Sequence, residues 1–222
     1  MKNIPKLIVM LTHNDKTVKN ARQIFGEVKN SKAEYFGMKE EGIPEEEMIV
    51  LYGDIRKAGK IPVLEVVAYT ERECLSGAEL ALKCRCEILM GTLFFDSVND
   101  FCKKNNIKYM PFVGRVSERP SILEGEIDDI ISEANCLIEK GVYGFDLLGY
   151  RHTKYPVELN YSFSQKVKAP VCIAGSVDSF ERLDEIKNAQ PWAFTIGGAF
   201  FENKFSGSFE NEINEVYDYM NK

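Results

Sequence analysis

The sequence predicts a single α/β domain over residues 1–222, folded as a (β/α)8 barrel of the TIM-barrel class. Eight short apolar runs alternate with eight polar stretches of helical character. At about 27 residues per unit, the chain is just long enough for eight strand-helix repeats. The last two apolar runs end in glycine, at Gly175 and Gly197. A doubly wound open sheet is the alternative, but it usually has fewer strands and does not predict two glycine-ended strands closing the chain.

The first half of the chain supplies four of the predicted units. Each apolar run is short and rich in β-branched, aromatic or other large residues, which favours a buried parallel strand. The expected strands are residues 6–11, 33–38, 62–67 and 88–92. The helices that follow them are expected at residues 16–28, 44–58, 71–83 and 96–104. Pro44 suits the first turn of the second helix.

The second half continues the alternation. The expected strands are residues 109–113, 144–148, 171–175 and 193–197. The helices are expected at residues 127–140, after a long connection, and at 156–166, 179–187 and 209–220. Gly141 is placed to end one helix and Ser208 to cap the start of another. Pro111 weakens the fifth strand, because proline cannot donate a backbone hydrogen bond.

Composition excludes several kinds of partner. The formal net charge is −6 and the isoelectric point about 5.2, so there is no general attraction for nucleic acid or anionic membranes. The N-terminal apolar run, Leu7 to Leu11, is too short for a signal-peptide core or a membrane span. We therefore expect a soluble cytoplasmic protein.

The six cysteines are scattered through expected helices and strands, which indicates reduced thiols. Cys84 and Cys86 form the only close pair, and without a second pair they are expected to be small buried residues rather than zinc ligands. His13 and His152 are the only histidines. No metal site is therefore predicted from the residues.

In a (β/α)8 barrel, the loops after the strands build the active site. Gly175-Ser176 and Gly197-Gly198 follow the seventh and eighth strands, where glycine lets backbone N–H groups approach a ligand closely. Such groups suit a phosphate dianion. The alternative is that these glycines only make tight turns.

Two carboxylates interrupt apolar strands. Glu65 lies in the third strand and Asp146 in the sixth, where burial is costly unless the acid is paired or functional. As a pair facing one barrel mouth, they are candidates for general acid/base catalysis. Equally, each could be ion-paired with a cation from a neighbouring strand end, such as Arg115 or Arg151.

Other strand ends carry further candidates. His13 follows the first strand and can shuttle a proton near neutral pH. Asp15 is expected to cap the following helix. Lys39, Thr92, Arg115 and Arg151 are candidates for positioning a substrate. No GxGxxG follows the first strand and no GxxxxGK[ST] occurs, so the residues predict no nucleotide cofactor.

Residues 170–200 resemble the seventh and eighth strands of the phosphate-binding barrel superfamily, which includes phosphoribosylanthranilate isomerase, sugar-phosphate epimerases and the tryptophan synthase α-subunit. The resemblance implies that Gly175, Ser176, Gly197 and Gly198 hold the phosphate. The sixth strand lacks the lysine that Schiff-base aldolases of related barrels keep there, which disfavours an imine mechanism. The paired His and Asp metal ligands of pentose-phosphate epimerases are also missing.

A second resemblance spans most of the chain. Four stretches are similar to short bacterial barrel proteins labelled 4-hydroxythreonine-4-phosphate dehydrogenase, an oxidoreductase of pyridoxal phosphate synthesis: Val9 to Asp15, Met90 to Thr92, Pro120 to Gly125 and Trp192 to Gly197. This resemblance implies an NAD(P) cofactor and a divalent metal held by several histidines.

Taken together, the sequence favours an enzyme that acts on a small phosphorylated metabolite by acid/base proton transfer, of isomerase, epimerase or lyase type. The dehydrogenase activity is one alternative. A non-catalytic phosphometabolite-binding protein is another, because fold does not settle function. Barrels of this size often pair, so a homodimer is a further expectation.

Overall fold

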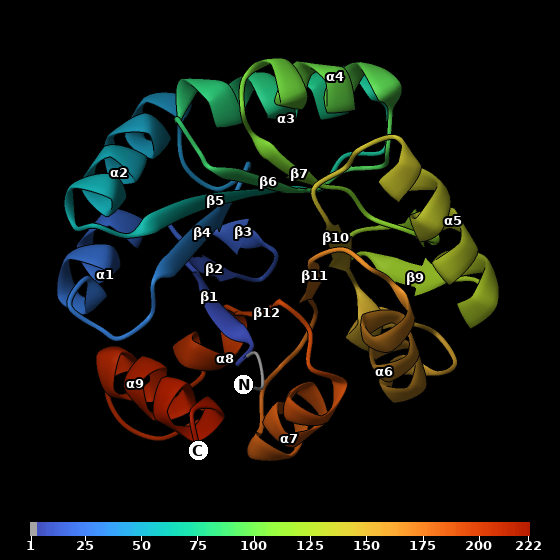
Figure 1. Ribbon diagram of the computed structural model, residues 1–222. Coiled ribbons are helices and arrows are strands. Elements are labelled where there is room, and N and C mark those ends of the chain that lie inside the picture. The colour runs from blue at the N-terminus through green and yellow to red at the C-terminus, as the bar shows by residue number, and fades with distance from the viewer. Residues whose placement is uncertain (1–3) are drawn as a thin grey trace.

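Residues 4–222, which the computed structural model describes, form a nearly closed barrel of eight parallel strands surrounded by helices (Figure 1). Neighbouring strands follow the order β10-β11-β12-β1-β4-β5-β6-β7. The strands are β1 (Lys6–Met10), β4 (Tyr35–Lys39), β5 (Ile61–Val66), β6 (Ile88–Gly91), β7 (Lys108–Met110), β10 (Phe145–Leu147), β11 (Val171–Ile173) and β12 (Ala193–Ile196). The predicted (β/α)8 architecture is confirmed.

The barrel closes between β7 and β10, which share no regular ladder. Instead, the N–H of Gly144 donates to the carbonyl of Tyr109 at 3.3 Å, and the N–H of Asp146 donates to the carbonyl of Pro111 at 3.0 Å. The fifth strand ends at Met110, earlier than expected, because Pro111 has no N–H to continue a ladder. Its carbonyl still helps to close the barrel.

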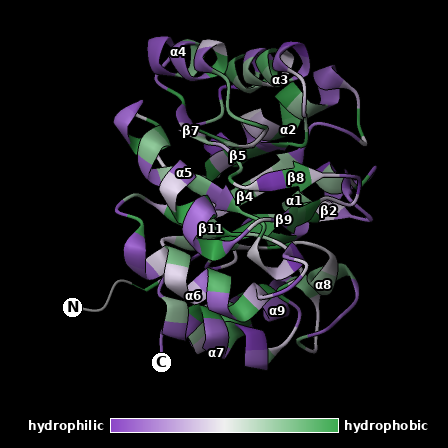
Figure 2. Cartoon of the chain, turned by 90° about the vertical axis from the view of Figure 1, so that its right-hand side faces the viewer, coloured by the Kyte–Doolittle hydropathy of each residue, from purple (hydrophilic) through white to green (hydrophobic). Residues whose placement is uncertain are grey.

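Helices form the outer layer (Figure 1). They are α1 (Ala21–Val28), α2 (Glu45–Lys57), α3 (Glu71–Lys83), α4 (Asp96–Lys104), α5 (Ile127–Glu139), α6 (Pro156–Lys166), α7 (Phe180–Ala189), the short α8 (Gly198–Phe201) and α9 (Phe209–Met220). The side chains of Thr70, Ser179 and Ser208 accept hydrogen bonds from first-turn amides of α3, α7 and α9, which confirms the cap predicted at Ser208. Figure 2 shows hydrophilic and hydrophobic residues alternating along the outer helices, as expected where one face is buried. None of the helices in residues 4–222 combines the length and hydrophobicity that crossing a membrane requires.

The first strand leads into a hairpin that was not predicted. Residues 12–17 pair as β2 (Thr12–His13) and β3 (Lys16–Thr17), so the first helix begins at Ala21 rather than at residue 16. Asn14 and Asp15 have φ values of 49° and 63°, the left-handed conformation that a two-residue hairpin turn requires. The expectation that Asp15 caps a helix is therefore wrong.

A second hairpin occupies the long connection after β7. It consists of β8 (Arg115–Ser117) and β9 (Ile122–Glu124), paired in antiparallel register. In Figure 2 the two hairpins and α8 gather on the same end of the molecule, where the strands end. These segments therefore build the surroundings of the barrel mouth.

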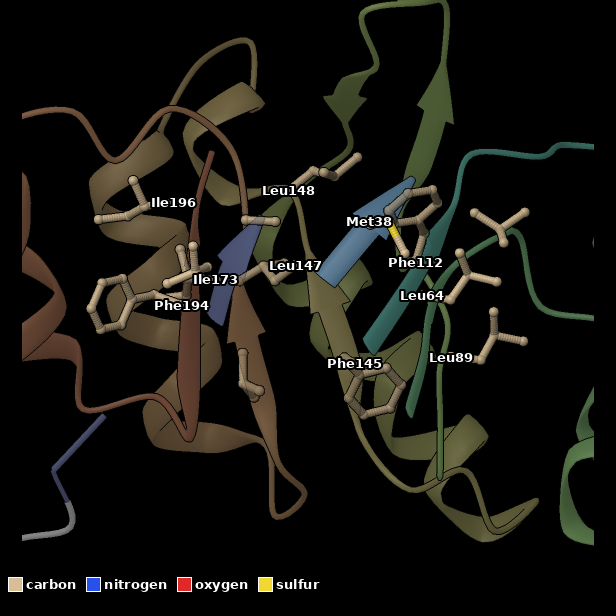
Figure 3. Close-up of a cluster of buried hydrophobic side chains, with 14 of the residues drawn as sticks. Met38, Leu64, Leu89, Phe112, Phe145, Leu147, Leu148, Ile173, Phe194 and Ile196 are labelled. Carbon is tan, nitrogen blue, oxygen red and sulfur yellow. The ribbon is translucent and has the colours of Figure 1, made fainter. Parts of the chain in front are cut away.

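Side chains point alternately outward and inward along the strands, which divides the core into two parts. Side chains pointing outward pack against the helices, as Leu64, Leu89, Phe145 and Phe194 do in Figure 3. Side chains pointing inward form a separate apolar cluster of Ile8, Met10, Tyr35, Val63, Ile88, Met90, Met110, Cys172 and Ala193. At its amino-terminal end, Trp192 packs edge-on against the rings of Tyr35 and Tyr143.

All six cysteines are free thiols. Cys136 is exposed, and the other five are buried: Cys74, Cys84, Cys86, Cys102 and Cys172. Cys84 and Cys86 are thus small buried residues, as expected from their isolation in the sequence.

Replacing Gly144 with alanine is expected to destabilise the barrel by about 1–3 kcal/mol, as overpacking does. A Cβ there would lie 2.2 Å from the carbonyl oxygen of Pro170, a backbone atom that cannot move without parting two strands. Gly53→Ala in α2 is the matched control, because a Cβ there meets nothing within 4 Å. It should raise stability by about 0.5–1 kcal/mol. Urea unfolding of the two variants measures both effects, and a Gly144→Ala variant as stable as the parent would contradict the assigned packing.

Candidate active site at the carboxyl ends of the strands

A cavity of about 450 Å³ opens where the strands end. Its walls come from segments that are far apart in the sequence, as expected for the catalytic face of a (β/α)8 barrel. The lining includes His13, Asp15, Lys39, Glu65, Ser121, Arg151, Gly175, Ser176, Gly197, Gly198 and Glu202. The cavity therefore brings together the four residues predicted to hold a phosphate and several of the charged residues predicted to act on a substrate.

Glycine occurs at three positions of the cavity lining for different physical reasons. Gly175 has φ +96°, which favours glycine, and a Cβ at Gly197 would lie only 2.7 Å from Oγ1 of Thr12. Turn geometry and close packing explain these two positions. A Cβ at Gly198 would meet no atom nearer than 3.7 Å, the closest being Cδ2 of His13. Packing therefore does not require glycine at position 198, where its absence of a side chain leaves space at the cavity wall.

Another part of the lining carries a buried ion cluster centred on Lys39. Its ammonium group donates to Oδ1 of Asp15 and lies 3.3 Å from Oε1 of Glu65. Lys39 and Glu65 are register partners on β4 and β5, and their side chains are only 9% and 8% exposed. Burial alone would lower the pKa of Lys39, but the two carboxylates outweigh it and raise that pKa above the ordinary value. Lys39 is therefore a stable cation at neutral pH.

Asp15 and Glu65 both line the cavity, but Glu65 has the fewer partners. Apart from the Lys39 ammonium, no hydrogen-bond or ion-pair partner of the Glu65 carboxylate occurs among the residues that the structure describes. Its oxygens are thus held near a cation while they remain accessible to a ligand.

Asp146 lies deeper and does not line the cavity. It is fully buried, and neither of its carboxylate oxygens has a hydrogen-bond partner in the described chain. Burial, reinforced by repulsion from Glu65, raises the pKa of Asp146 well above its usual range, against the attraction of Lys39 and Arg151. The expectation that both acids face the mouth is therefore corrected, because Glu65 lines the cavity whereas Asp146 is enclosed within the barrel.

Arg151 and His13 lie nearer the cavity entrance. Nη1 of Arg151 donates to the carbonyl of Ser121 at 3.3 Å, and Nη2 lies 3.9 Å from Oδ1 of Asp15. Nε2 of His13 lies 3.4 Å from Oε1 of Glu202. Both side chains are partly exposed and border the cavity, so they remain candidates for contact with a ligand.

The structure places Thr92 and Arg115 away from the cavity. Thr92 is fully buried and its hydroxyl shares a 2.7 Å hydrogen bond with that of Tyr109. Arg115 lies on β8 with 74% of its side chain exposed, 3.5 Å from the carboxylate of Glu124. Neither residue is retained in the candidate site. The cation beside Glu65 is Lys39, rather than Arg115.

Three contributors to the site were not recognised in the sequence. Asp15 was assigned to a helix cap, and Ser121 and Thr195 were not singled out, although both line the cavity. Thr195 was open to recognition, because it is a polar residue at an inward position of an apolar strand, as Glu65 is. Ser121 gave no comparable signal, because it lies in an irregular turn.

The side chains do not fit a metal site built from several histidines. In residues 4–222 no group of three or more His, Cys, Asp and Glu side chains is arranged to hold a metal ion. His13 lies at the cavity entrance, whereas His152 is buried, with its Nε2 2.9 Å from the carbonyl of Gly125 and its Nδ1 accepting from the N–H of Tyr155. The two histidines thus lie in different environments and do not face a common site.

Comparison with known proteins gives matches only at the level of structure. No family model matches the chain, and no curated protein matches it. Orotidine 5'-phosphate decarboxylase from Pyrococcus horikoshii is similar with a TM-score of 0.70 at 10% identity, over 97% of this chain and 99% of that one. Tryptophan synthase from M. tuberculosis gives 0.69 at 12%, over 100% and 95%. N-acetylmannosamine-6-phosphate 2-epimerase from Clostridium perfringens gives 0.63 at 13%, over 89% and 88%.

These similarities agree with the fold class observed, a TIM barrel. Two of the three are named for phosphorylated substrates. At 10–13% identity, these similarities show the fold alone. The comparisons give no support to the dehydrogenase activity implied by the second resemblance.

The free energy of unfolding of Asp146→Asn, compared with that of the parent, is expected to increase as pH rises from 5 to 8. Between the unfolded aspartate pKa, about 3.9, and its raised folded value, the folded parent binds more protons than the unfolded chain. Its stability therefore falls with pH, by at most about 1.4 kcal/mol per unit for one proton. The asparagine does not titrate. Urea unfolding of both proteins at several pH values gives the difference, and a difference that is constant or moves the other way would show that Asp146 is already ionised at pH 5.

Proposed function

We propose that this protein is an enzyme that moves a proton next to the carbonyl group of a small phosphorylated metabolite. One observation carries the proposal, namely that a single cavity joins the glycine-ended strands to the buried Lys39–Glu65 pair. The glycine-ended strands suit an anion, and the Lys39–Glu65 pair suits proton transfer. A substrate bound between them is held at one end and reacts at the other.

The phosphate end is formed by Gly175, Ser176, Gly197 and Gly198. The first amides of α8 have no carbonyl partner within the helix, and the open space at Gly198 lets an anion approach them. Arg151 lies beside Gly175 and supplies a guanidinium for a charge-assisted hydrogen bond. The phosphorylated substrates named for two structural neighbours are consistent with this assignment.

At the reacting end, Glu65 is the general base. It is accessible from the cavity and takes the proton from the carbon beside the substrate carbonyl. The ammonium of Lys39 stabilises the negative charge that develops on the carbonyl oxygen. Because its pKa is raised, Lys39 lacks the free amine that a Schiff base requires.

Asp146 does not line the cavity, so it acts on the base only through its charge. Burial and the charge of Glu65 raise the pKa of Asp146 well above its usual range, which limits the negative charge that it adds to the site. His13 borders the cavity, where it can return a proton to the deprotonated substrate. The same first step serves isomerisation, epimerisation and a lyase reaction, which differ in what the deprotonated substrate does next.

Glu65→Gln is expected to reduce proton exchange about 100-fold or more, because the amide cannot act as a base. The assay incubates the protein with a panel of aldose and ketose monophosphates in D2O and follows loss of the C–H signal by NMR. Glu79→Gln, a change at an exposed glutamate of α3, is the matched control and should leave the rate unchanged.

The panel also separates the alternatives. New isomers or cleavage products in the same spectra identify the reaction type, and reduction of added NAD+ would instead indicate the dehydrogenase activity. Binding of phosphorylated compounds without exchange of any C–H proton would contradict the enzymatic proposal and support a metabolite-binding protein.

Gly198→Ala is expected to fold normally but to weaken binding of inorganic phosphate about tenfold or more, which corresponds to about 1.4 kcal/mol. The methyl group meets no protein atom nearer than 3.7 Å, yet it fills space in front of the α8 amides. Gly26→Ala in α1 is the matched control, because a Cβ there meets nothing within 4 Å. It should bind phosphate like the parent. Isothermal titration calorimetry measures the affinities, and equal binding by both variants would place the phosphate elsewhere.

A further inference from the structure

We infer that Arg119, which does not line the cavity, is a positioning residue for the proton-transfer end of the site. The inference rests on the proposed function and assigns Arg119 a role through Asp15. Arg119 lies in the turn between β8 and β9, far in sequence from the strand ends that it contacts.

The guanidinium of Arg119 contacts three other segments at the barrel mouth: those that follow β4 and β5, and the β2–β3 hairpin. It donates to the carboxylates of Glu40 and Glu41, directly after β4, and to the carbonyl of Val67, directly after β5, at 3.1 Å. Its Nε also lies 3.9 Å from Oδ2 of Asp15, in the first hairpin. One side chain, 34% exposed, thereby ties the β8–β9 turn to the ends of the first three barrel strands.

A second contact fixes the same turn independently. The hydroxyl of Tyr69 donates to the carbonyl of Glu118 at 2.6 Å and shares a 2.8 Å hydrogen bond with Oγ of Ser121. Arg119 lies between these two anchored residues. The turn is thus held on both sides of the arginine, which sets the position of Ser121 in the cavity wall.

One path leads from Arg119 to the proton-transfer end. It passes through Asp15, whose Oδ2 lies 3.9 Å from Nε of Arg119 and whose Oδ1 accepts from Lys39. The carbonyl of Ser121 leads instead to Arg151, at the phosphate end. Losing the guanidinium leaves Glu40, whose carboxylate is largely buried, without its cation, and leaves Asp15 with Lys39 and Arg151 alone. Asp15 then has one cation fewer, and a shift of its carboxylate displaces the ammonium of Lys39 from the position it needs beside the substrate carbonyl.

The test compares Arg119→Ala and Arg119→Lys with Arg115→Ala, a matched control on the same hairpin whose side chain points to solvent. In the D2O exchange assay, Arg119→Ala should lower kcat about 10- to 100-fold, the scale expected for a displaced catalytic group. Affinity for inorganic phosphate should stay within about threefold of the parent, because the glycine wall is untouched and Tyr69 still holds Ser121, the partner of Arg151. Arg119→Lys should be intermediate, since an ammonium cannot make the forked contact with two carboxylates.

Added guanidinium chloride distinguishes positioning from general destabilisation. At about 20 mM, far below denaturing concentrations, it should restore part of the rate to Arg119→Ala and leave the Arg115→Ala rate unchanged. An Arg119→Ala protein that keeps the parental kcat, or loses activity in a way that neither lysine nor guanidinium restores, would overturn the inference.

A readout that needs no turnover separates this inference from the proposed function. Amide hydrogen exchange should accelerate at residues 117–121 and also at residues 12–17 in Arg119→Ala, but not in Arg115→Ala. If the parent protein exchanges no substrate proton, the proposed function fails whatever these amides do. If residues 12–17 exchange at the parental rate in Arg119→Ala, the link from Arg119 to Asp15 is wrong.

Discussion

The contact of Lys39 with Asp15 and Glu65 is the constraint around which the barrel mouth is arranged. A buried ammonium loses several kcal/mol of hydration unless opposite charges replace the water. Glu65 comes from the neighbouring strand in register, but Asp15 must be brought over from the first loop. The β2–β3 hairpin does this, because the left-handed turn at Asn14 and Asp15 folds the chain back towards the mouth.

The same constraint explains the state of Asp146. Lys39 has its negative partners already, so a third carboxylate close by would add repulsion without a further cation to offset it. The least costly state of Asp146 is the neutral acid, consistent with its two unpartnered oxygens. The upper interior of the barrel therefore balances its charges by protonation as well as by pairing.

The strand pattern and the polar interruptions could be predicted from the sequence, because burial on both faces leaves a strong apolar signal in which Glu65 and Asp146 stand out. Their partners could not be predicted. Lys39 looked like an ordinary strand-end lysine, and only the β4–β5 register places it beside Glu65. Arg115 was misplaced because the fifth strand stops at Met110 and the following hairpin turns that side chain to solvent. Arg119 contacts residues more than 50 positions away, a relation that depends on the folded hairpin and has no local pattern.

The two ends of the barrel interior differ in charge. At the amino-terminal end, Trp192 packs edge-on against the rings of Tyr35 and Tyr143, next to the inward-facing apolar cluster. The charged groups that shift the pKa of Asp146, namely Glu65, Lys39 and Arg151, all line the cavity at the other end. Ionisation inside the barrel therefore responds to charges at its carboxyl-terminal end.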